Sequence, residues 1–167
     1  MKMKEKSIEL LNKAVADEMH AVHQYMYFHF HCDDQGYDLL ASMFKRTAVE
    51  EMIHVEKLAE RILFLKGDVE LKAKQDVAKL HDVKKMLQMA ADMEKESAEE
   101  YNIWANESAK NNDNATKKIF EELVDDEERH FDQFDNEIEQ LAKFGDNYLA
   151  LQSIERSRSR ESGGTTE

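Results

Sequence analysis

Two Glu-x-x-His pairs are the residues of this sequence best suited to chemistry. They are Glu51 with His54 and Glu127 with His130. A separation of three positions places both side chains of a pair on one face of an α-helix. Carboxylate oxygens with one imidazole nitrogen per metal suit iron or manganese, whereas an all-oxygen set suits magnesium or calcium. The two pairs therefore predict metal ligands on two separate helices.

Two further glutamates, Glu18 and Glu94, lie on the apolar stripes of two other helical segments. Four carboxylates in one apolar interior could not all stay ionised unaided, and two divalent cations would balance their charge. A single Glu-x-x-His pair is more often a surface glutamate beside a core histidine. Two such pairs with a glutamate on each of two other helices are the pattern of carboxylate di-metal bundles. The predicted ligands are Glu18, Glu51, His54, Glu94, Glu127 and His130.

Helical spacing decides which of two adjacent glutamates is the ligand. Glu50 shares a face with Arg46 and Lys57, which predicts that it faces solvent. Glu51 lies instead on the apolar stripe, because it is four residues from Thr47 and seven from Leu58. The same test prefers the ligands on the other helices to their acidic neighbours. It distinguishes them less clearly around Glu94, because that segment is rich in acidic residues.

The elements that must position these residues are long helices. The chain of 167 residues has no proline, five glycines and 35% charged residues, and alternating apolar runs typical of strands are missing. Its class is predicted to be all-α. Apolar residues recur at spacings of three and four, with stops at glycine or asparagine, in four segments. These segments are about 7–31, 37–66, 82–110 and 115–144.

The connections predict how these helices are arranged. The first and third connections are short, so each joins an antiparallel pair, whereas residues 68–81 are numerous enough to run the length of a bundle. The predicted fold is a four-helix bundle, up-down-down-up, with one long crossover and a short fifth helix over about 146–155. We expect one domain over residues 1–158 and a disordered tail over residues 159–167.

Charge and composition exclude several classes of partner. The net charge of −13 disfavours nucleic acid and anionic membrane surfaces and favours cations. Cys32 is the single cysteine, so neither an intrachain disulfide nor a cysteine-based metal cluster is possible. No signal peptide and no apolar segment long enough for a membrane span are recognisable, which predicts a cytoplasmic protein.

At these residues the sequence resembles the bacterioferritins of the ferritin-like superfamily, over about residues 1–155. The resemblance rests on "NKAVADEMHAVHQY", "EEMIHVEKLAERILFLKG", "ELVDDEERHFD" and "DNYLALQ". It implies a ferroxidase centre in which Glu51 and Glu127 bridge two irons, Glu18 and Glu94 are terminal ligands, and His54 and His130 each hold one iron. It also implies a hollow shell of 24 subunits, built from two-fold dimers, that stores ferric mineral, with the fifth helix around its four-fold channels.

Met52 is the residue through which the resemblance implies a second cofactor. It lies off the core-facing stripe, on a second apolar stripe with Ala48, Val55 and Leu63, which predicts a subunit interface. In bacterioferritins a methionine at such a two-fold interface ligates a shared haem, here haem b or a related porphyrin. The alternative is that Met52 only packs at the dimer contact.

Tyr25 shares the stripe of Glu18, and the resemblance suggests an oxidisable residue beside the di-iron site; a core tyrosine is the alternative. Some bacterioferritins carry a histidine that binds iron on the inner surface near position 46. Arg46 cannot take that role.

The leading functional hypothesis is iron storage and detoxification by a ferroxidase that uses O2 or H2O2. A ferredoxin-type reductant for iron release is expected by analogy with the family. Three alternatives were weighed. A rubrerythrin-like di-iron peroxidase is disfavoured because no C-x-x-C element is present. A DNA-protecting miniferritin is disfavoured because one chain carries all six ligands and the protein is acidic. The last is a non-catalytic haem-binding or structural shell.

Overall fold

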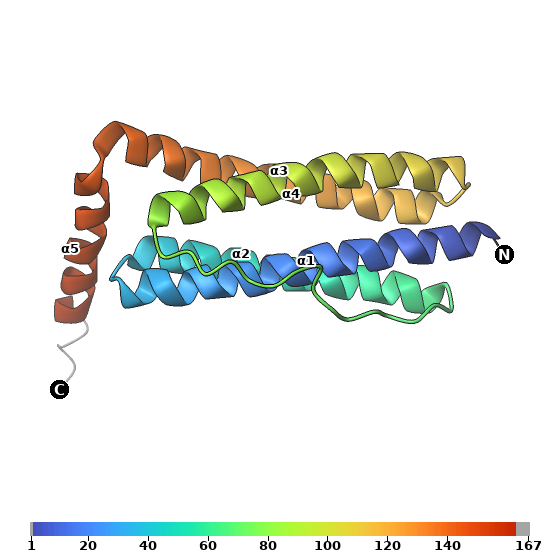
Figure 1. Ribbon diagram of the computed structural model, residues 1–167, viewed down its shortest axis with the longest axis horizontal. Helices are drawn as coiled ribbons and strands as arrows, with labels where there is room; N and C mark the ends of the chain where they lie inside the picture. The colour runs from blue at the N-terminus through green and yellow to red at the C-terminus, as the bar shows by residue number, and fades with distance from the viewer. Residues whose placement is uncertain (1, 163–167) are drawn as a thin grey trace.

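The computed structural model describes residues 2–162, and within this range every regular element is a helix. Four long helices lie side by side and a fifth lies across one end of them (Figure 1). Their bounds are α1 (Lys2–Asp34), α2 (Asp38–Phe64), α3 (Val83–Lys110), α4 (Asn114–Phe144) and α5 (Asp146–Ser162). The predicted all-α class and the four-helix bundle with a C-terminal fifth helix are confirmed.

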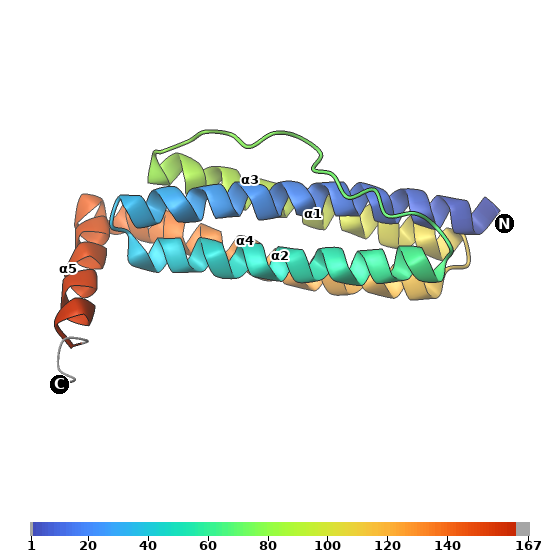
Figure 2. The ribbon, with the colours of Figure 1, turned by 90° about the horizontal axis from the view of Figure 1, so that it is seen from below.

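The long connection between α2 and α3 gives the bundle its topology. Helices α1 and α2 form one antiparallel pair and α3 and α4 the other, and the crossover carries the chain back along the bundle, so that α3 runs parallel to α2 (Figure 1). Figure 2 shows the crossover passing over α1 and α3. Gln24 of α1 fixes it there, because its amide bonds both the N–H and the C=O of Ala78 at 2.8 and 3.0 Å. The predicted up-down-down-up order is confirmed.

The apolar interior is divided into two clusters along the bundle. One, near α5, contains Phe28, Phe44 and Phe134, and the other contains Leu58 and Phe120. The six predicted ligands come from positions between these clusters on every long helix and are themselves buried. Removing apolar surface from water stabilises the folded protein by about 25 cal/mol per Å². The two clusters therefore supply the packing that holds the polar middle of the bundle together.

Helix α1 begins earlier than predicted. The first predicted segment starts at about residue 7, but α1 begins at Lys2, so Ser7 lies buried inside the helix. The Ser7 hydroxyl donates to Asp113 at 2.6 Å, at the turn between α3 and α4. Asp113 is itself the N-cap of α4 and accepts from the backbone N–H of Thr116 at 3.1 Å. Ser7 therefore bonds a distant helix cap, a role that local sequence does not reveal.

Helix α5 is longer than predicted. It begins at Asp146, after Gly145 with φ of 60°, and continues to Ser162 where an end near residue 155 was expected. Arg156 holds it to the α1–α2 turn through a bond to the Asp33 carbonyl oxygen at 3.1 Å and an ion pair with Asp38. Residues 159–162 of the predicted tail are thus helical. The remainder of that tail, 163–167, lies outside the described residues.

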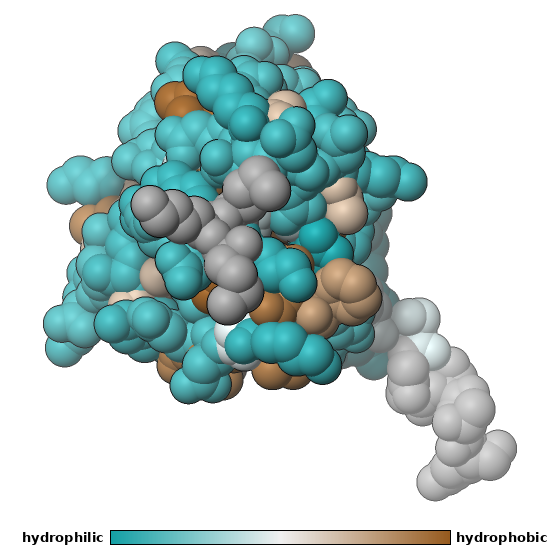
Figure 3. Space-filling model, turned by 90° about the vertical axis from the view of Figure 1, so that its right-hand side faces the viewer, coloured by the Kyte–Doolittle hydropathy of each residue, from teal (hydrophilic) through white to brown (hydrophobic). Residues whose placement is uncertain are grey.

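The surface at the end of the bundle opposite α5 is mostly hydrophilic, with scattered apolar side chains (Figure 3). In the described part of the chain, no helix is long and apolar enough to cross a membrane.

Candidate metal centre

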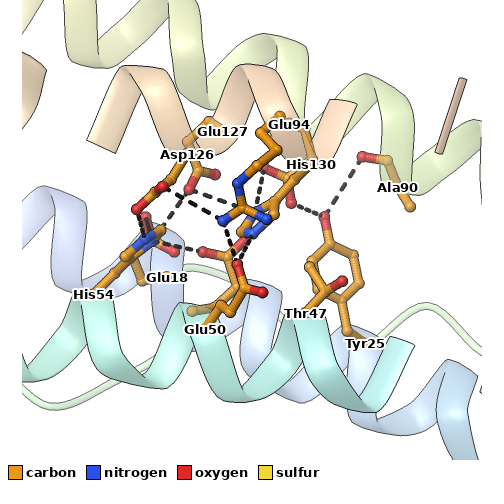
Figure 4. A network of polar contacts seen from close by, with 12 residues as sticks. Glu18, Tyr25, Thr47, Glu50, His54, Ala90, Glu94, Asp126, Glu127 and His130 are labelled. Carbon is orange, nitrogen blue, oxygen red and sulfur yellow. Dashed lines mark hydrogen bonds and ion pairs between the residues drawn. The ribbon is translucent and has the colours of Figure 1, made fainter. Parts of the chain in front are cut away.

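The structure brings the six predicted ligands together in the middle of the bundle. Two overlapping groups of side chains have ligand atoms within 4.8 Å of one another. The first group is Glu18, Glu51, His54 and Glu127, and the second is Glu51, Glu94, Glu127 and His130. Because Glu51 and Glu127 belong to both, the geometry is that of two adjacent cation positions sharing two carboxylates. Figure 4 shows Glu18, His54, Glu94, Glu127 and His130 converging from the four long helices.

The two antiparallel helix pairs contribute equivalent sets of ligands to the centre. Glu18 of α1 corresponds to Glu94 of α3, and the separation between them along the chain equals that between Glu51 and Glu127. The two histidines are separated by the same number of residues, and their rings stack with centroids 6.0 Å apart. Each half of the bundle therefore supplies one terminal carboxylate, one shared carboxylate and one imidazole.

Both imidazoles direct Nδ1 toward the carboxylates. His54 Nδ1 lies 2.9 Å from Glu51, 3.1 Å from Glu127 and 3.5 Å from Glu18. His130 Nδ1 lies 3.3 Å from Glu51, with Glu94 and Glu127 at 3.6 and 3.8 Å. None of these approaches has the geometry of a hydrogen bond, so both Nδ1 atoms and several carboxylate oxygens are buried without a hydrogen-bond partner. Natural proteins seldom leave such atoms unsatisfied.

The outer nitrogens of the two histidines contact carboxylates that the sequence had assigned to solvent. His130 Nε2 lies 2.7 Å from Glu50, and His54 Nε2 lies 2.9 Å from Asp126. Glu50 had been predicted to face water, but it reaches across from α2 to α4, while Asp126 reaches from α4 to α2. An Nε2–H that donates to these oxygens leaves Nδ1 free as a metal ligand. Each acid therefore orients the histidine of the opposite helix.

Two buried tyrosines bond the terminal carboxylates. Tyr25, singled out from the sequence, donates to Glu94 at 2.5 Å, and Tyr101, to which the sequence pattern assigned no role, donates to Glu18 at 2.7 Å. Each tyrosine lies seven residues after a ligand of its own helix and bonds the ligand of the other. That repeated spacing is the signal that could have identified Tyr101.

Burial and mutual repulsion set the charge of the shared carboxylates. Burial, followed by the charges of Glu18 and Glu94, raises the pKa of Glu51 well above its usual range. Burial and the other carboxylates raise the pKa of Glu127 in the same direction. Burial also acts to raise the pKa of Glu94, but close contacts with Glu127 and His130 outweigh it and bring the pKa to about 2. Without bound cations, some of these carboxylates are therefore protonated, which lowers the negative charge of the cluster.

The histidines compensate part of this negative charge. Burial would lower the pKa of His54, but the carboxylates of Glu127, Glu18 and Glu51 raise it far above its usual value. Burial likewise opposes a charged His130, but Glu94 and its neighbours raise its pKa to about 9. A protonated imidazole in the metal-free protein thus occupies the electrostatic role that a divalent cation would take. Metal binding would release these protons.

A pocket of about 500 Å³ reaches the centre between α1, α3 and the crossover. Tyr25 and Glu94 line its inner part, and Asp92 and Glu96 of α3 also line it. His20 of α1 contributes a buried ring whose Nε2 has no hydrogen-bond partner. The carboxylates and the imidazole give this approach donor groups suited to a divalent cation.

The structure changes the predicted second apolar stripe on α2. Ala48 and Val55 of that stripe are buried within the chain, whereas Met52 and Leu63 are exposed, Met52 by 46%. Near Met52 on α2, the exposed apolar side chains are Val49 and Ile53, which are not part of the predicted stripe. The apolar surface around Met52 is therefore a patch of Val49, Met52 and Ile53.

Comparison with known proteins matches the model of the ferritin-like domain to residues 8–144. A bacterioferritin of Desulfovibrio desulfuricans is 36% identical over 147 residues, which cover 88% of this chain and 82% of that protein. A bacterioferritin of Brucella melitensis is 34% identical over 146 residues, covering 87% of this chain and 91% of that protein.

A solved structure shares the fold over nearly the whole chain. The crystal structure of the Desulfovibrio desulfuricans bacterioferritin matches with a TM-score of 0.89 and 35% identity, covering 91% of this chain and 89% of that one. That structure was described for its di-iron site in different catalytic states.

Proposed function

Because this chain belongs to the ferritin-like family, with bacterioferritins as relatives over most of its length, we propose that it stores and detoxifies iron by oxidising Fe(II) to Fe(III). The observation that carries the proposal is the pair of overlapping groups at the centre of the bundle. Their unpartnered, buried oxygen and nitrogen atoms match in kind and position what two iron ions require.

The ligand roles follow from this arrangement. Glu51 and Glu127 would bridge the two metal positions, since each belongs to both groups. Glu18 with His54 would complete one position, and Glu94 with His130 the other. Glu50 and Asp126 would keep each imidazole oriented, and Tyr101 would orient Glu18. The chain's own contribution is then to place two Fe(II) ions side by side in a site that is largely closed to water.

The reaction balances as a two-electron step. Two Fe(II) ions each lose one electron to one oxidant molecule, which reduces O2 with two protons to H2O2, or H2O2 with two protons to two waters. The protons that the carboxylates and histidines hold in the metal-free protein leave as iron binds. Tyr25, whose phenol donates to Glu94, would be the oxidisable side chain beside this site, able to reduce a second H2O2 together with one Fe(II) by giving one electron and its phenolic proton.

Assembly and haem complete the proposal. Twenty-four chains in a cytoplasmic shell, formed from two-fold dimers, would enclose the mineral, and residues 1–158 would form the subunit's domain. The exposed patch of Val49, Met52 and Ile53 supports a two-fold contact. There a thioether from each chain would ligate one haem between them, and a ferredoxin-type protein would supply electrons for iron release.

The function is tested by adding Fe(II) to the purified protein under air. The wild type should oxidise Fe(II) and elute as a particle of several hundred kDa. Glu127→Ala should slow the oxidation by at least about 100-fold at unchanged particle size, because a shared ligand of both positions is lost. Glu128→Ala is the matched control, since Glu128 is the adjacent exposed acid on α4.

Equal oxidation by Glu127→Ala and the wild type would refute the assigned centre. A wild type that elutes as a small dimer and does not oxidise Fe(II) would refute the storage function. Rapid oxidation that requires H2O2 and forms no mineral would identify a rubrerythrin-like peroxidase instead.

A further inference from the structure

Arg129 lies over the metal centre on the face formed by α2 and α4. Its guanidinium is 2.5 Å from Glu50 of α2 and 3.4 Å from Asp126 of its own helix. These are the two carboxylates that contact the outer nitrogens of His130 and His54. The guanidinium of Arg129 therefore links the two carboxylates that contact the histidines from outside. The function proposed above does not require this link.

The contacts form a continuous closure from one helix to the other. His130 and His54 are buried, and together they separate the shared carboxylates from this face. Glu50 accepts from both His130 and Arg129 through the same oxygen, Oε2. A cation passing between the histidines would have to displace contacts of Glu50 or Asp126, and it would meet the guanidinium outside them.

The charge of Arg129 makes this closure selective. The guanidinium of Arg129 keeps its positive charge, because arginine is not deprotonated in proteins. Like charges a few ångströms apart near a protein surface repel each other, and salt screens this repulsion. Arg129 therefore weakens the attraction that Glu50 and Asp126 would otherwise exert on an incoming divalent cation.

The opposite face of the centre differs. The pocket between α1, α3 and the crossover reaches Glu94 and Tyr25, and Asp92 and Glu96 also line it. Lys74 of the crossover lines this pocket too, and it pairs with Asp17 at 3.2 Å and with Glu96 at 4.0 Å. Neither of these acids is a carboxylate that contacts the outer nitrogen of His54 or His130, so the two faces differ in the contacts that a passing cation would displace.

We propose that Arg129 is a cationic lid on the α2/α4 face of the metal centre, which slows the passage of divalent cations through that face by tying Glu50 to Asp126. The lid rests on the proposed metal centre. It assigns Arg129 a gating role, without direct contact to the metal, and leaves the α1/α3 pocket as the open approach.

The test measures how fast the assembled, metal-free protein takes up Co(II), followed by the visible absorption of the bound ion after rapid mixing at low ionic strength. Variants Arg129→Lys, Arg129→Gln and Arg129→Glu change the charge at one exposed position. The control is Lys57→Gln, which removes the cation of another α2–α4 ion pair, Lys57 with Glu122 at 2.9 Å, and leaves both histidine supports intact. Equilibrium titration of every variant gives the number of ions bound.

The uptake rates should follow the charge at position 129. Arg129→Gln should load at least about threefold faster than the wild type and Arg129→Glu faster still, while Arg129→Lys and Lys57→Gln stay within about twofold of it. All should bind two Co(II) per chain.

Three results would overturn the lid. They are an unchanged rate in Arg129→Gln, an equal acceleration in Lys57→Gln, and a rate in Arg129→Lys as high as in Arg129→Gln. If the wild type itself binds no Co(II), the metal centre fails and the lid with it. Two ions per chain with rates independent of residue 129 refute the lid alone.

Discussion

Replacing Glu51 by glutamine should stabilise the metal-free protein and abolish its stabilisation by metal. Glu51 is completely buried, and burial together with the charges of Glu18 and Glu94 raises its pKa well above its usual value of 4.5. A carboxyl whose pKa is raised by folding binds its proton more tightly in the folded state. Its contribution is therefore lost as pH rises above the unfolded pKa, and folding is disfavoured at neutral pH.

The magnitude follows from the linkage between protons and folding. While Glu51 stays protonated in the folded protein, each pH unit above its unfolded pKa costs about 1.4 kcal/mol of stability. Glutamine is nearly isosteric and carries no such cost, but its amide needs partners of its own. We therefore expect about 1–3 kcal/mol of net stabilisation at pH 7, or about 3–10 °C in the thermal midpoint for a chain of this size.

The assay is calorimetry of metal-free wild type, Glu51→Gln and the control Glu56→Gln between pH 5 and pH 8, each repeated with Co(II). Glu56 lies on the same helix and is exposed, so its replacement should change little. The wild type should lose stability as pH rises and regain it with Co(II), whereas Glu51→Gln should show a flatter pH profile and little response to metal. A lower midpoint for metal-free Glu51→Gln, or an equal gain from Co(II) in both proteins, would refute the reasoning.

Three further predictions concern the haem, the tyrosine and a helix cap. Met52→Leu should remove the Soret absorption of haem-supplied protein and leave Fe(II) oxidation within about twofold of the wild type; a persisting Soret band would exclude Met52 as the ligand. Tyr25→Phe should remove a tyrosyl-radical signal from samples frozen during Fe(II) oxidation, and its survival would assign the radical to another residue. Asp113→Asn should cost about 1–3 kcal/mol at pH 7, because the cap loses its charged partner for Arg61 at 2.7 Å. Although burial opposes it, bonds from Ser7 and Thr116 lower the pKa of Asp113, so this stabilisation is present at neutral pH and lost as pH falls through the folded pKa; a wild type and an Asp113→Asn variant with parallel acid-unfolding profiles would contradict that.

Helical periodicity was sufficient to place the six ligands on the buried faces of their helices, although it did not place Ala48 and Val55 there. It preferred Glu51 to Glu50, and the structure buries Glu51 completely. The long crossover followed from the number of residues in 68–81, and the third helical segment begins as predicted after residue 82, where Asp82 caps α3 by accepting from the N–H of Lys85 at 3.0 Å. These are properties of short stretches of chain, because spacing, capping and the length of a connection depend only on nearby residues.

Contacts between helices were decided only by the tertiary structure. Glu50 is on the outward side of α2, but the packing of α2 against α4 brings it to His130 and Arg129. The contacts of Tyr101 and Ser7 also depend on the tertiary structure, since each side chain bonds a residue of a different element. The sequence alone determined the core-facing stripe of each helix, on which the six ligands lie. The axial register and rotation between helices, which are set by how both clusters of apolar side chains pack, decided which polar atoms meet across them.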